Sequence, residues 1–208
     1  MTLGIAIPVG HEDIEFLPRI LNSIDNSTLL PNKVVISVSG VRTFNYNEKH
    51  NFELIVKHSF SQNGVSKNRN IASSYLDTDV ISFMDADDTS HPQRNEYIME
   101  AMKTSDVVVH NYLPTKEMDE NFLKEKYESP LILQDYIDET LEDCKYPVSS
   151  NEHKPYTCGH LSIKKNLMLE NKFDETLSYG EDAEFLKNIV LKGTKITLIE
   201  NKLSNYIK

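Results

Sequence analysis

The sequence predicts an α/β fold in which a mostly parallel central sheet carries helices on both faces. Strand-like and helix-like segments alternate over the first 110 residues, which is typical of repeated β-α-β units. Val80–Met84 is a short continuous apolar run, as expected for a strand buried on both faces. The length of 208 residues fits one domain with a substantial core. We therefore expect a single domain over residues 1–208, with a first half of 1–110 and a second half of 111–208.

The expected strands are short apolar or β-branched runs that alternate with helical patterns. They are Leu3–Val9, Lys33–Ser39, Phe52–Lys57, Val80–Met84, Asp106–His110, His160–Ile163 and Lys195–Ile199. The expected helices follow the 3.6-residue apolar spacing, which is clearest in the first of them. They are Ile14–Ile24, Ser66–Leu76, Pro92–Met102, Leu133–Leu141 and Asp182–Leu191. Ser66 is a candidate N-cap, and Pro92 suits a first helical turn.

Residues 111–155 differ in character from the rest of the chain. They are acidic and are interrupted by prolines, with Leu133–Leu141 as the one good helix candidate. They contain too few apolar residues for a core of their own. We expect an excursion over the sheet and not a second domain.

The charge balance excludes one broad class of partner. The formal net charge is −10, from 32 acidic and 22 basic residues, and no basic run is longer than Lys164-Lys165. Nucleic-acid binding needs clustered Lys and Arg, so we expect no nucleic-acid partner. An anionic ligand would need a local metal ion or a local basic pocket.

Cysteine usage and hydropathy indicate the compartment. Cys144 and Cys158 have neither metal-ligand spacing nor the pattern of a disulfide framework, which suits reduced thiols in the cytoplasm. No apolar run approaches the roughly 20 residues of a transmembrane helix. Leu3–Val9 lacks the basic flank and cleavage site of a signal peptide. We expect a cytoplasmic protein, with a peripheral place at the cytoplasmic face of a membrane as an option.

Three carboxylates follow the apolar strand Val80–Met84: Asp85, Asp87 and Asp88. Ligands of open α/β sheets bind outside the carboxyl ends of strands, so these acids are expected at a binding edge. Like charges this close repel unless a cation compensates, and Mg²⁺ or Mn²⁺ is held by carboxylates together with phosphate oxygens. The loop predicts a metal–diphosphate clamp. The alternative is a solvated acidic turn in which Asp88 or Ser90 caps the next helix.

Two helix starts carry further candidate residues. Gly64–Asn70 places Lys67 and Arg69 at a helix N-terminus, where exposed N–H groups favour anions; the alternative is a capped helix whose cations face water. Gly180–Phe185 opens another helix with acids. Asp182 is a candidate general base for an acceptor hydroxyl, with Glu181 assisting it, whereas acids in a first turn also simply suit the helix dipole.

Four segments, in the same order along the chain, resemble the motifs of glycosyltransferase family 2, the inverting enzymes of GT-A fold. They are Ile5–Val9, Gly64–Asn70, Phe83–Asp88 with Pro92, and Phe173–Phe185. The resemblance covers nearly the whole chain. It implies a single Rossmann-like GT-A-type domain with a nucleotide-binding half, 1–110, and an acceptor-side half, 111–208.

The resemblance implies a role for each matching position. Asp87, with Asp85, would hold Mn²⁺ or Mg²⁺, and Asp182, assisted by Glu181, would be the catalytic base. The nucleotide sugar would contact Pro8, Val9, Glu12, Ser39, Lys67, Arg69, Asp85 and Ala86, and Gly159 and His160 would lie on the acceptor side. The implied donor is a nucleoside-diphosphate sugar, UDP-linked by preference, and the implied acceptor is a glycan, lipid-linked or protein hydroxyl. The reaction would be a displacement at the anomeric carbon with inversion.

The chain departs from the family pattern at three places. Ser39 stands where relatives have an acid that helps to read uracil, and Gly10-His11 replaces the usual Tyr-Asn, although Glu12 keeps an acid nearby. The chain stops at Lys208, about where many relatives place a His of the metal site. Either another group such as water serves there, or the domain is part of a larger glycosyltransferase chain.

Three further interpretations stay open at this point. Asp85-Ala86-Asp87-Asp88-Thr89 also fits the nucleophile loop of haloacid-dehalogenase-like phosphatases, with Asp85 as nucleophile, although such loops usually open their domain. A non-catalytic module that binds sugar nucleotides or glycans is the main alternative to an enzyme. His160 could be a structural strand-edge residue, and His110 is expected to be buried and hydrogen-bonded.

Overall fold

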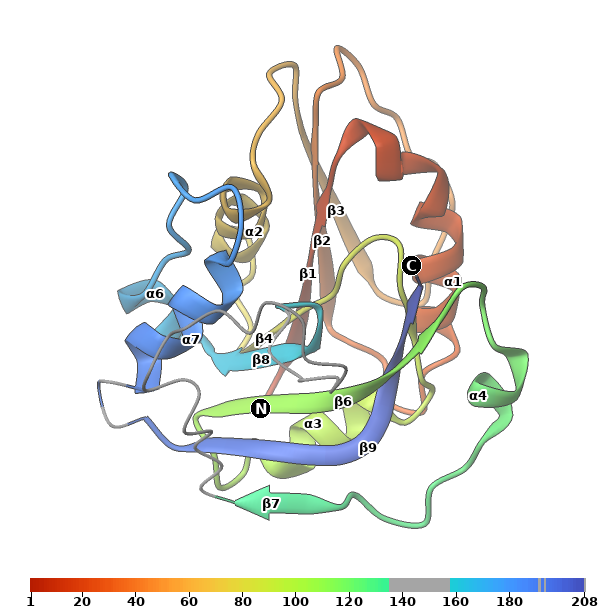
Figure 1. The fold of residues 1–208 in the computed structure, drawn as a ribbon. Helices are drawn as coiled ribbons and strands as arrows, with labels where there is room; N and C mark the ends of the chain where they lie inside the picture. Colours follow the sequence, from red (N-terminus) through yellow and green to blue (C-terminus); the bar gives the residue numbers. More distant parts are fainter. Residues whose placement is uncertain (135–157, 191, 193, 208) are drawn as a thin grey trace.

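The computed structural model describes residues 1–134, 158–190, 192 and 194–207 (Figure 1). They form an α/β domain around one sheet, with the strand order β3-β2-β1-β4-β8-β6-β9-β5 and with β7 paired to β9. The strands are β1 Leu3–Val9, β2 Lys33–Ser39, β3 Glu53–Ser59, β4 Val80–Phe83, β5 Thr89–Ser90, β6 Val107–Thr115, β7 Ile132–Gln134, β8 Leu161–Lys164 and β9 Ile196–Ile207. The helices are η1 His11–Phe16, α1 Leu17–Asp25, α2 Val65–Ser74, α3 Arg94–Ala101, α4 Glu120–Lys124, η2 Cys158–His160, α6 Lys165–Glu170 and α7 Glu181–Val190.

The sheet has a parallel half and a mixed half. β1 lies between β2 and β4, and β3 extends the sheet beyond β2, all of them parallel. β8 then runs antiparallel to both β4 and β6, while β6 and β9 are parallel to each other. The prediction of a mostly parallel sheet is therefore confirmed, with antiparallel strands in its second half.

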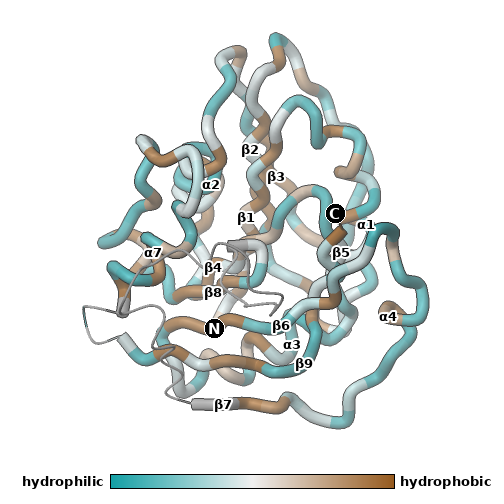
Figure 2. Tube along the Cα trace, viewed as in Figure 1, coloured by the Kyte–Doolittle hydropathy of each residue, from teal (hydrophilic) through white to brown (hydrophobic). Residues whose placement is uncertain are grey.

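Helices cover both faces of the sheet, as predicted. Alternation along β1 divides its side chains: Ala6 joins the core beneath α2, α6 and α7, whereas Ile5 and Ile7 join the core beneath α1. A third cluster packs α3 against β6 and β9. Figure 2 shows hydrophobic residues along the central strands and hydrophilic residues along the outer loops. None of the described helices is long and apolar enough to span a membrane.

Two helix starts differ from the prediction. Ser66 is not the N-cap of α2, because the helix begins at Val65 and extended Gly64 takes the cap position. The segment expected as one helix from Ile14 begins as the 3₁₀ helix η1, and α1 starts at Leu17 with Pro18 in its first turn. Neither α1 nor α2 has a side-chain hydrogen bond at its N-cap, whereas at the start of η1 the Asp13 carboxylate accepts from Gly10 N at 3.3 Å.

The second half holds the larger corrections. The expected helix Leu133–Leu141 is wrong at its start, because Leu133 and Gln134 belong to strand β7; the rest of it lies outside the described residues. β6 continues to Thr115 and β9 to Ile207, well beyond the predicted strand ends at His110 and Ile199. The register of this pair shifts around Asn111. Such irregularities bend strands, and Figure 1 shows both strands curving towards the C-terminus.

Candidate functional site

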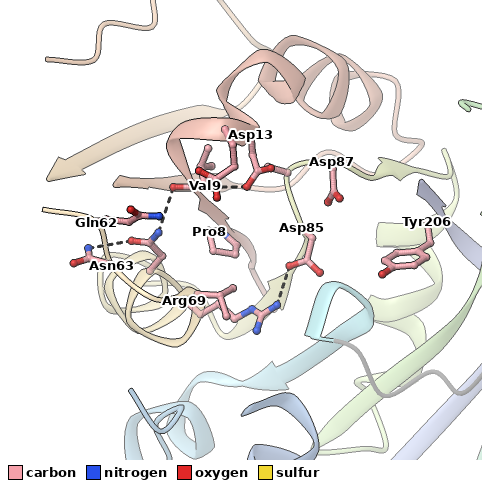
Figure 3. A pocket seen from close by; sticks show the side chains of 14 residues that line it. Pro8, Val9, Asp13, Gln62, Asn63, Arg69, Asp85, Asp87 and Tyr206 are labelled. Atoms are coloured by element: carbon pink, nitrogen blue, oxygen red, sulfur yellow. Dashed lines mark hydrogen bonds and ion pairs between the residues drawn. The ribbon is translucent and has the colours of Figure 1, made fainter. Parts of the chain in front are cut away.

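A pocket of about 300 Å³ lies at the carboxyl ends of β1 and β4, the edge where the parallel strands deliver their following loops (Figure 3). It is lined by Pro8, Val9, Gly10, Glu12, Asp13, Gln62, Asn63, Val65, Asn68, Arg69, Asp85, Ala86, Asp87 and Tyr206. Of the residues expected to contact a nucleotide sugar or a metal, seven line it: Pro8, Val9, Glu12, Arg69, Asp85, Ala86 and Asp87. The structure therefore brings segments from four parts of the chain to one cavity.

The acidic loop 85–88 is fastened at both ends. Met84 N donates to Ala6 O at 3.2 Å, which continues the β1–β4 pairing to the start of the loop. Asp88 N donates to Asp85 O at 3.3 Å and closes a turn, and the following strand β5 pairs with β9. Arg19 of α1 donates a further hydrogen bond to Asp87 O. These hydrogen bonds hold the loop backbone in place, and with it the positions of the three carboxylates.

Arg69 joins the acidic loop to the start of α7. Its Nη2 donates to Asp85 Oδ1 at 2.9 Å, and its Nη1 donates to Glu181 Oε1 at 2.7 Å. The Arg69 side chain is only 4% exposed, so water screens these pairs weakly. Gly159 packs against the same acid, since a Cβ there would stand 2.8 Å from Asp85 Oδ2. The orientation of Asp85 is therefore set from two sides.

The other loop carboxyls are destabilised as anions. Burial raises the pKa of Asp87, and the charge of Asp85 adds to the rise. Burial also raises the pKa of Asp88 well above its ordinary value, with further contributions from Asp85 and Asp87. Asp13, which lines the same pocket, has a pKa raised by burial. Burial and mutual repulsion thus both oppose the ionisation of these acids, which a nearby cation would favour.

The donor set at this end suits a hard divalent cation. Asp85 and Asp87 both line the pocket and offer carboxylate oxygens, the ligands that Mg²⁺ and Mn²⁺ prefer. Among the described residues no group of three or more His, Cys, Asp or Glu could hold a metal ion. Two carboxylates completed by water and phosphate oxygens are nevertheless the usual arrangement for Mg²⁺. The residues present fit a cation that binds together with a phosphorylated ligand.

The Asp87→Asn variant is expected to be more stable than the wild type in metal-free buffer. A carboxyl whose pKa is raised by folding costs stability wherever it is ionised, above that raised pKa. The gain should be about 0.5–2 kcal/mol at pH 7 and should shrink as the pH falls towards the ordinary Asp pKa of about 4. Urea denaturation at pH 7, 6 and 5 measures it. A gain that does not change with pH would contradict this electrostatic cause.

The start of α7 holds the candidate base. Gly180 has a φ of 75°, a conformation that favours glycine, and α7 begins at the next residue. Burial raises the pKa of Asp182, and the Glu181 charge adds to the rise while Arg69 opposes it. Glu181 and Asp182 do not line the pocket themselves, but Glu181 is tied to its wall through Arg69.

Two predicted nucleotide contacts lie outside the pocket lining. Ser39 is fully buried, and its Oγ accepts from Asn68 Nδ2 at 3.0 Å, so it supports a wall residue from behind. Lys67 is exposed on the outer side of α2 and is not among the lining residues. Ser39 and Lys67 are therefore not lining residues, and their direct contacts with a nucleotide sugar stay predictions.

A buried polar layer lies under the acidic loop. Arg94 is fully buried and donates to Ser82 Oγ, Phe83 O and His110 Nε2 at 2.9, 2.9 and 3.0 Å. Burial and the Arg94 charge lower the pKa of His110, so this residue is neutral. The expectation of a buried, hydrogen-bonded His110 is confirmed.

His160 belongs to the same layer. It is fully buried and stacks on Tyr112 with the ring centroids 4.4 Å apart, and burial lowers its pKa to about 3. Its Nε2 lies 3.8 Å from Asp88 Oδ2, a contact between a neutral ring and a carboxyl of raised pKa. This burial suits the alternative of a structural residue at a strand edge, and the acceptor-side role of His160 stays a prediction.

Tyr206 is a pocket residue that the sequence did not reveal. It lies in β9 beyond the predicted strand end and reaches the acidic loop because β6 and β9 curve together. Burial raises its pKa, and the charges of Asp88, Asp87 and Asp85 add to the rise. Figure 3 shows its ring on the same side of the pocket as Asp85 and Asp87.

Comparison with solved structures defines the class of fold. The crystal structure of S. aureus TarS 1-349 superposes with a TM-score of 0.70 at 15% identity, covering 100% of this chain and 60% of that one. The same protein in complex with UDP and with UDP-GlcNAc gives a TM-score of 0.69 at 16% identity in both cases, with 61% and 59% of those chains covered. The chain thus has a GT-A-type fold similar to that of TarS and spans about 60% of the length of these structures.

Comparison with family sequence patterns then gives the family. The pattern of the family described as "Glycosyl transferase family 2" matches residues 5–162, which include the acidic loop and Arg69. The chain belongs to glycosyl transferase family 2. No curated protein sequence matches it. Membership in this family argues against the phosphatase interpretation of Asp85.

Proposed function

We propose that this chain is a metal-dependent, inverting glycosyltransferase that moves a sugar from a nucleoside diphosphate to a hydroxyl acceptor. One observation carries the proposal: Arg69 pairs with Asp85 of the acidic loop and with Glu181 at the start of α7. The guanidinium thereby links the acidic loop of the pocket to Glu181, the residue directly before the candidate base, Asp182. The donor site and the acceptor site would then be connected through the buried guanidinium of Arg69.

Asp182 would accept the proton of the acceptor hydroxyl as that oxygen attacks the anomeric carbon. Burial and the neighbouring Glu181 raise its pKa, which makes it a stronger base than an exposed Asp. Glu181, held by Arg69 at 2.7 Å, would fix the first turn of α7 that carries the base. A single displacement by the acceptor inverts the configuration of the transferred sugar.

Asp87 and Asp85 would hold the divalent cation, Mn²⁺ or Mg²⁺, at the acidic end of the pocket. When bound, such an ion supplies positive charge that stabilises a departing diphosphate. Arg69 would keep Asp85 oriented towards that position, and Tyr206 would shield the acidic end from water. Pro8, Val9, Glu12 and Ala86 would form the remaining wall.

The proposed donor is a UDP-sugar, and the TarS structures with UDP and UDP-GlcNAc support this choice. The proposed acceptor is a hydroxyl of a glycan, a lipid-linked molecule or a protein. Residues 1–110 would bind the nucleotide, and residues 111–208 would lie on the acceptor side. We propose a cytoplasmic location, in solution or at the cytoplasmic face of a membrane.

Thermal unfolding with UDP tests the proposal directly. A ligand that binds only the folded state at 100 times its Kd adds about 2.7 kcal/mol, which is about 5–10 °C for a chain of this size. We expect this shift with UDP and Mn²⁺ together and a much smaller one when EDTA replaces Mn²⁺. Asp87→Asn should lose the metal-dependent part. Absence of any shift with nucleoside diphosphates and metal would overturn the proposal.

A further inference from the structure

The pocket has two chemically different ends. Figure 3 shows Asp85, Asp87 and Tyr206 on one side and Gln62 and Asn63 on the other. The side chains labelled at the second end are neutral amides. A nucleoside diphosphate has the same division, with its charge on the phosphates and a neutral base at the far end. If the proposed function holds, on which this inference rests, the base lies against the amide end.

The orientation of one buried amide is fixed by the backbone. Asn68 is 2% exposed, and its side chain lies 3.2 Å from Val9 O. A carbonyl oxygen can only accept, so the atom facing it is the amide nitrogen, Nδ2. The same nitrogen donates to Ser39 Oγ at 3.0 Å. The oxygen Oδ1 of Asn68 consequently points the other way.

This orientation fixes the next amide in turn. Asn63 Nδ2 lies 3.2 Å from Asn68 Oδ1, which can only accept, and 3.1 Å from Ser59 Oγ. The Ser59 hydroxyl already donates to Ser61 O at 2.8 Å, so its oxygen accepts from Asn63. Both N–H bonds of Asn63 are therefore used inside the wall. Turning the amide over would set its oxygen against Asn68 Oδ1, and the Ser59 hydroxyl would have to leave Ser61 O to donate to it.

The atom that Asn63 has left for a ligand is its Oδ1. The only hydrogen bonds of the Asn63 side chain to other described residues are the two made by its nitrogen. The residue itself lines the pocket and is partly exposed. Asn63 therefore keeps one hydrogen-bond acceptor, Oδ1, that makes no bond to another described residue, at a position in the pocket lining.

We propose that Asn63 Oδ1 reads the ring N–H of the nucleotide base and so selects uracil over cytosine. Uracil carries a hydrogen on N3, which an acceptor can bond. Cytosine has a bare lone pair at N3, which would face the oxygen of Asn63 without a proton between them. Val9, Asn68 and Ser59 act as positioning residues, and Ser39 acts through Asn68 without touching the base. This accounts for base recognition in a chain that lacks an acid at position 39.

Isothermal titration of UDP and CDP in Mn²⁺ tests the proposal. The wild type should prefer UDP by about tenfold or more, the effect of one satisfied against one opposed hydrogen bond. Asn63→Ala should bring the UDP-to-CDP ratio close to one, mainly by weakening UDP. The exposed Asn22→Ala in α1 is the matched control and should keep the wild-type ratio.

The positioning of Asn63 by Asn68 has a separate test. Asn68→Leu removes the acceptor that holds the Asn63 nitrogen, so the amide can turn over and the ratio should fall, with the fold checked by circular dichroism. A wild-type ratio that survives in Asn63→Ala would overturn the proposal, as would its collapse in Gln62→Ala instead. Wild-type protein that binds neither nucleotide would instead contradict the proposed function, which keeps the two failures distinct.

Discussion

Replacing Asp182 with Asn is expected to slow sugar transfer by about 10²–10⁴-fold while UDP binding stays near the wild-type value. The amide keeps the size of the side chain but cannot take a proton from the acceptor hydroxyl. Asp182 is separate from the pocket lining, so the nucleotide contacts should be unchanged. Release of UDP, coupled to acceptor glycosylation, measures the rate, and titration measures binding.

The matched control for this variant is Glu184→Gln, which removes an acid from the same first turn of α7. It should transfer sugar at close to the wild-type rate. Transfer by Asp182→Asn as fast as by the wild type would show that another group is the base. Tight UDP binding by the wild type, without turnover on any donor and acceptor, would favour the non-catalytic module.

The pH dependence of the sugar-transfer rate tests whether Asp182 is the base. Burial and Glu181 raise the pKa of Asp182, and the base works only when it is ionised. Transfer by the wild type should therefore fall as the pH drops through that raised pKa, at a higher pH than for an ordinary Asp near 4. The residual transfer rate of Asp182→Asn should not show this fall at low pH.

Replacing Arg69 with Met is expected to cost about 3 kcal/mol of unfolding free energy. The change leaves Asp85 and Glu181 without the cation that both carboxylates contact within 2.9 Å. Breaking a buried ion pair is expensive because the remaining charges lose their partner while they stay desolvated. Urea denaturation at pH 7 without metal measures the loss.

Two comparisons separate electrostatics from packing. Arg69→Met combined with Glu181→Gln should recover part of the loss, since one stranded charge is removed. Exposed Arg42→Met should change stability by no more than about 0.5 kcal/mol. A loss in Arg69→Met that the double variant does not reduce would assign the cost to the hydrocarbon part of Arg69 alone.

The first half of the fold could be predicted closely because its signals are local. Leu3–Val9 and Lys33–Ser39 form strands with the predicted bounds, since each is an apolar run whose length matches a buried strand. The second half could not, because β6 and β9 owe their outer halves to pairing with each other. Tyr112 and Ser204 are partners there, 92 positions apart by the register, and neither stretch has a strand pattern of its own.

The site was predictable where one short segment carries the chemistry. The acidic loop and Arg69 stand next to recognisable element ends, and the pocket contains them. Asn63 and Gln62 were not predicted, although both follow β3 and so lie at the carboxyl edge of the sheet. Their position was a usable signal, but the orientation of the Asn63 amide depends on Val9 O and could only come from the structure.

The pairing of β6 with β9 has a consequence for how the protein acquires its pocket during folding. Pro8 and Tyr206 line the same cavity, although almost the whole chain lies between them in the sequence. Ile207 N also donates to Asp88 Oδ1 at 3.3 Å. Contacts of such long sequence separation form slowly, because the loop between them has to be closed first. Ligand affinity should therefore appear with the slowest refolding phase, after β1–β4 and their helices have gained protection from hydrogen exchange.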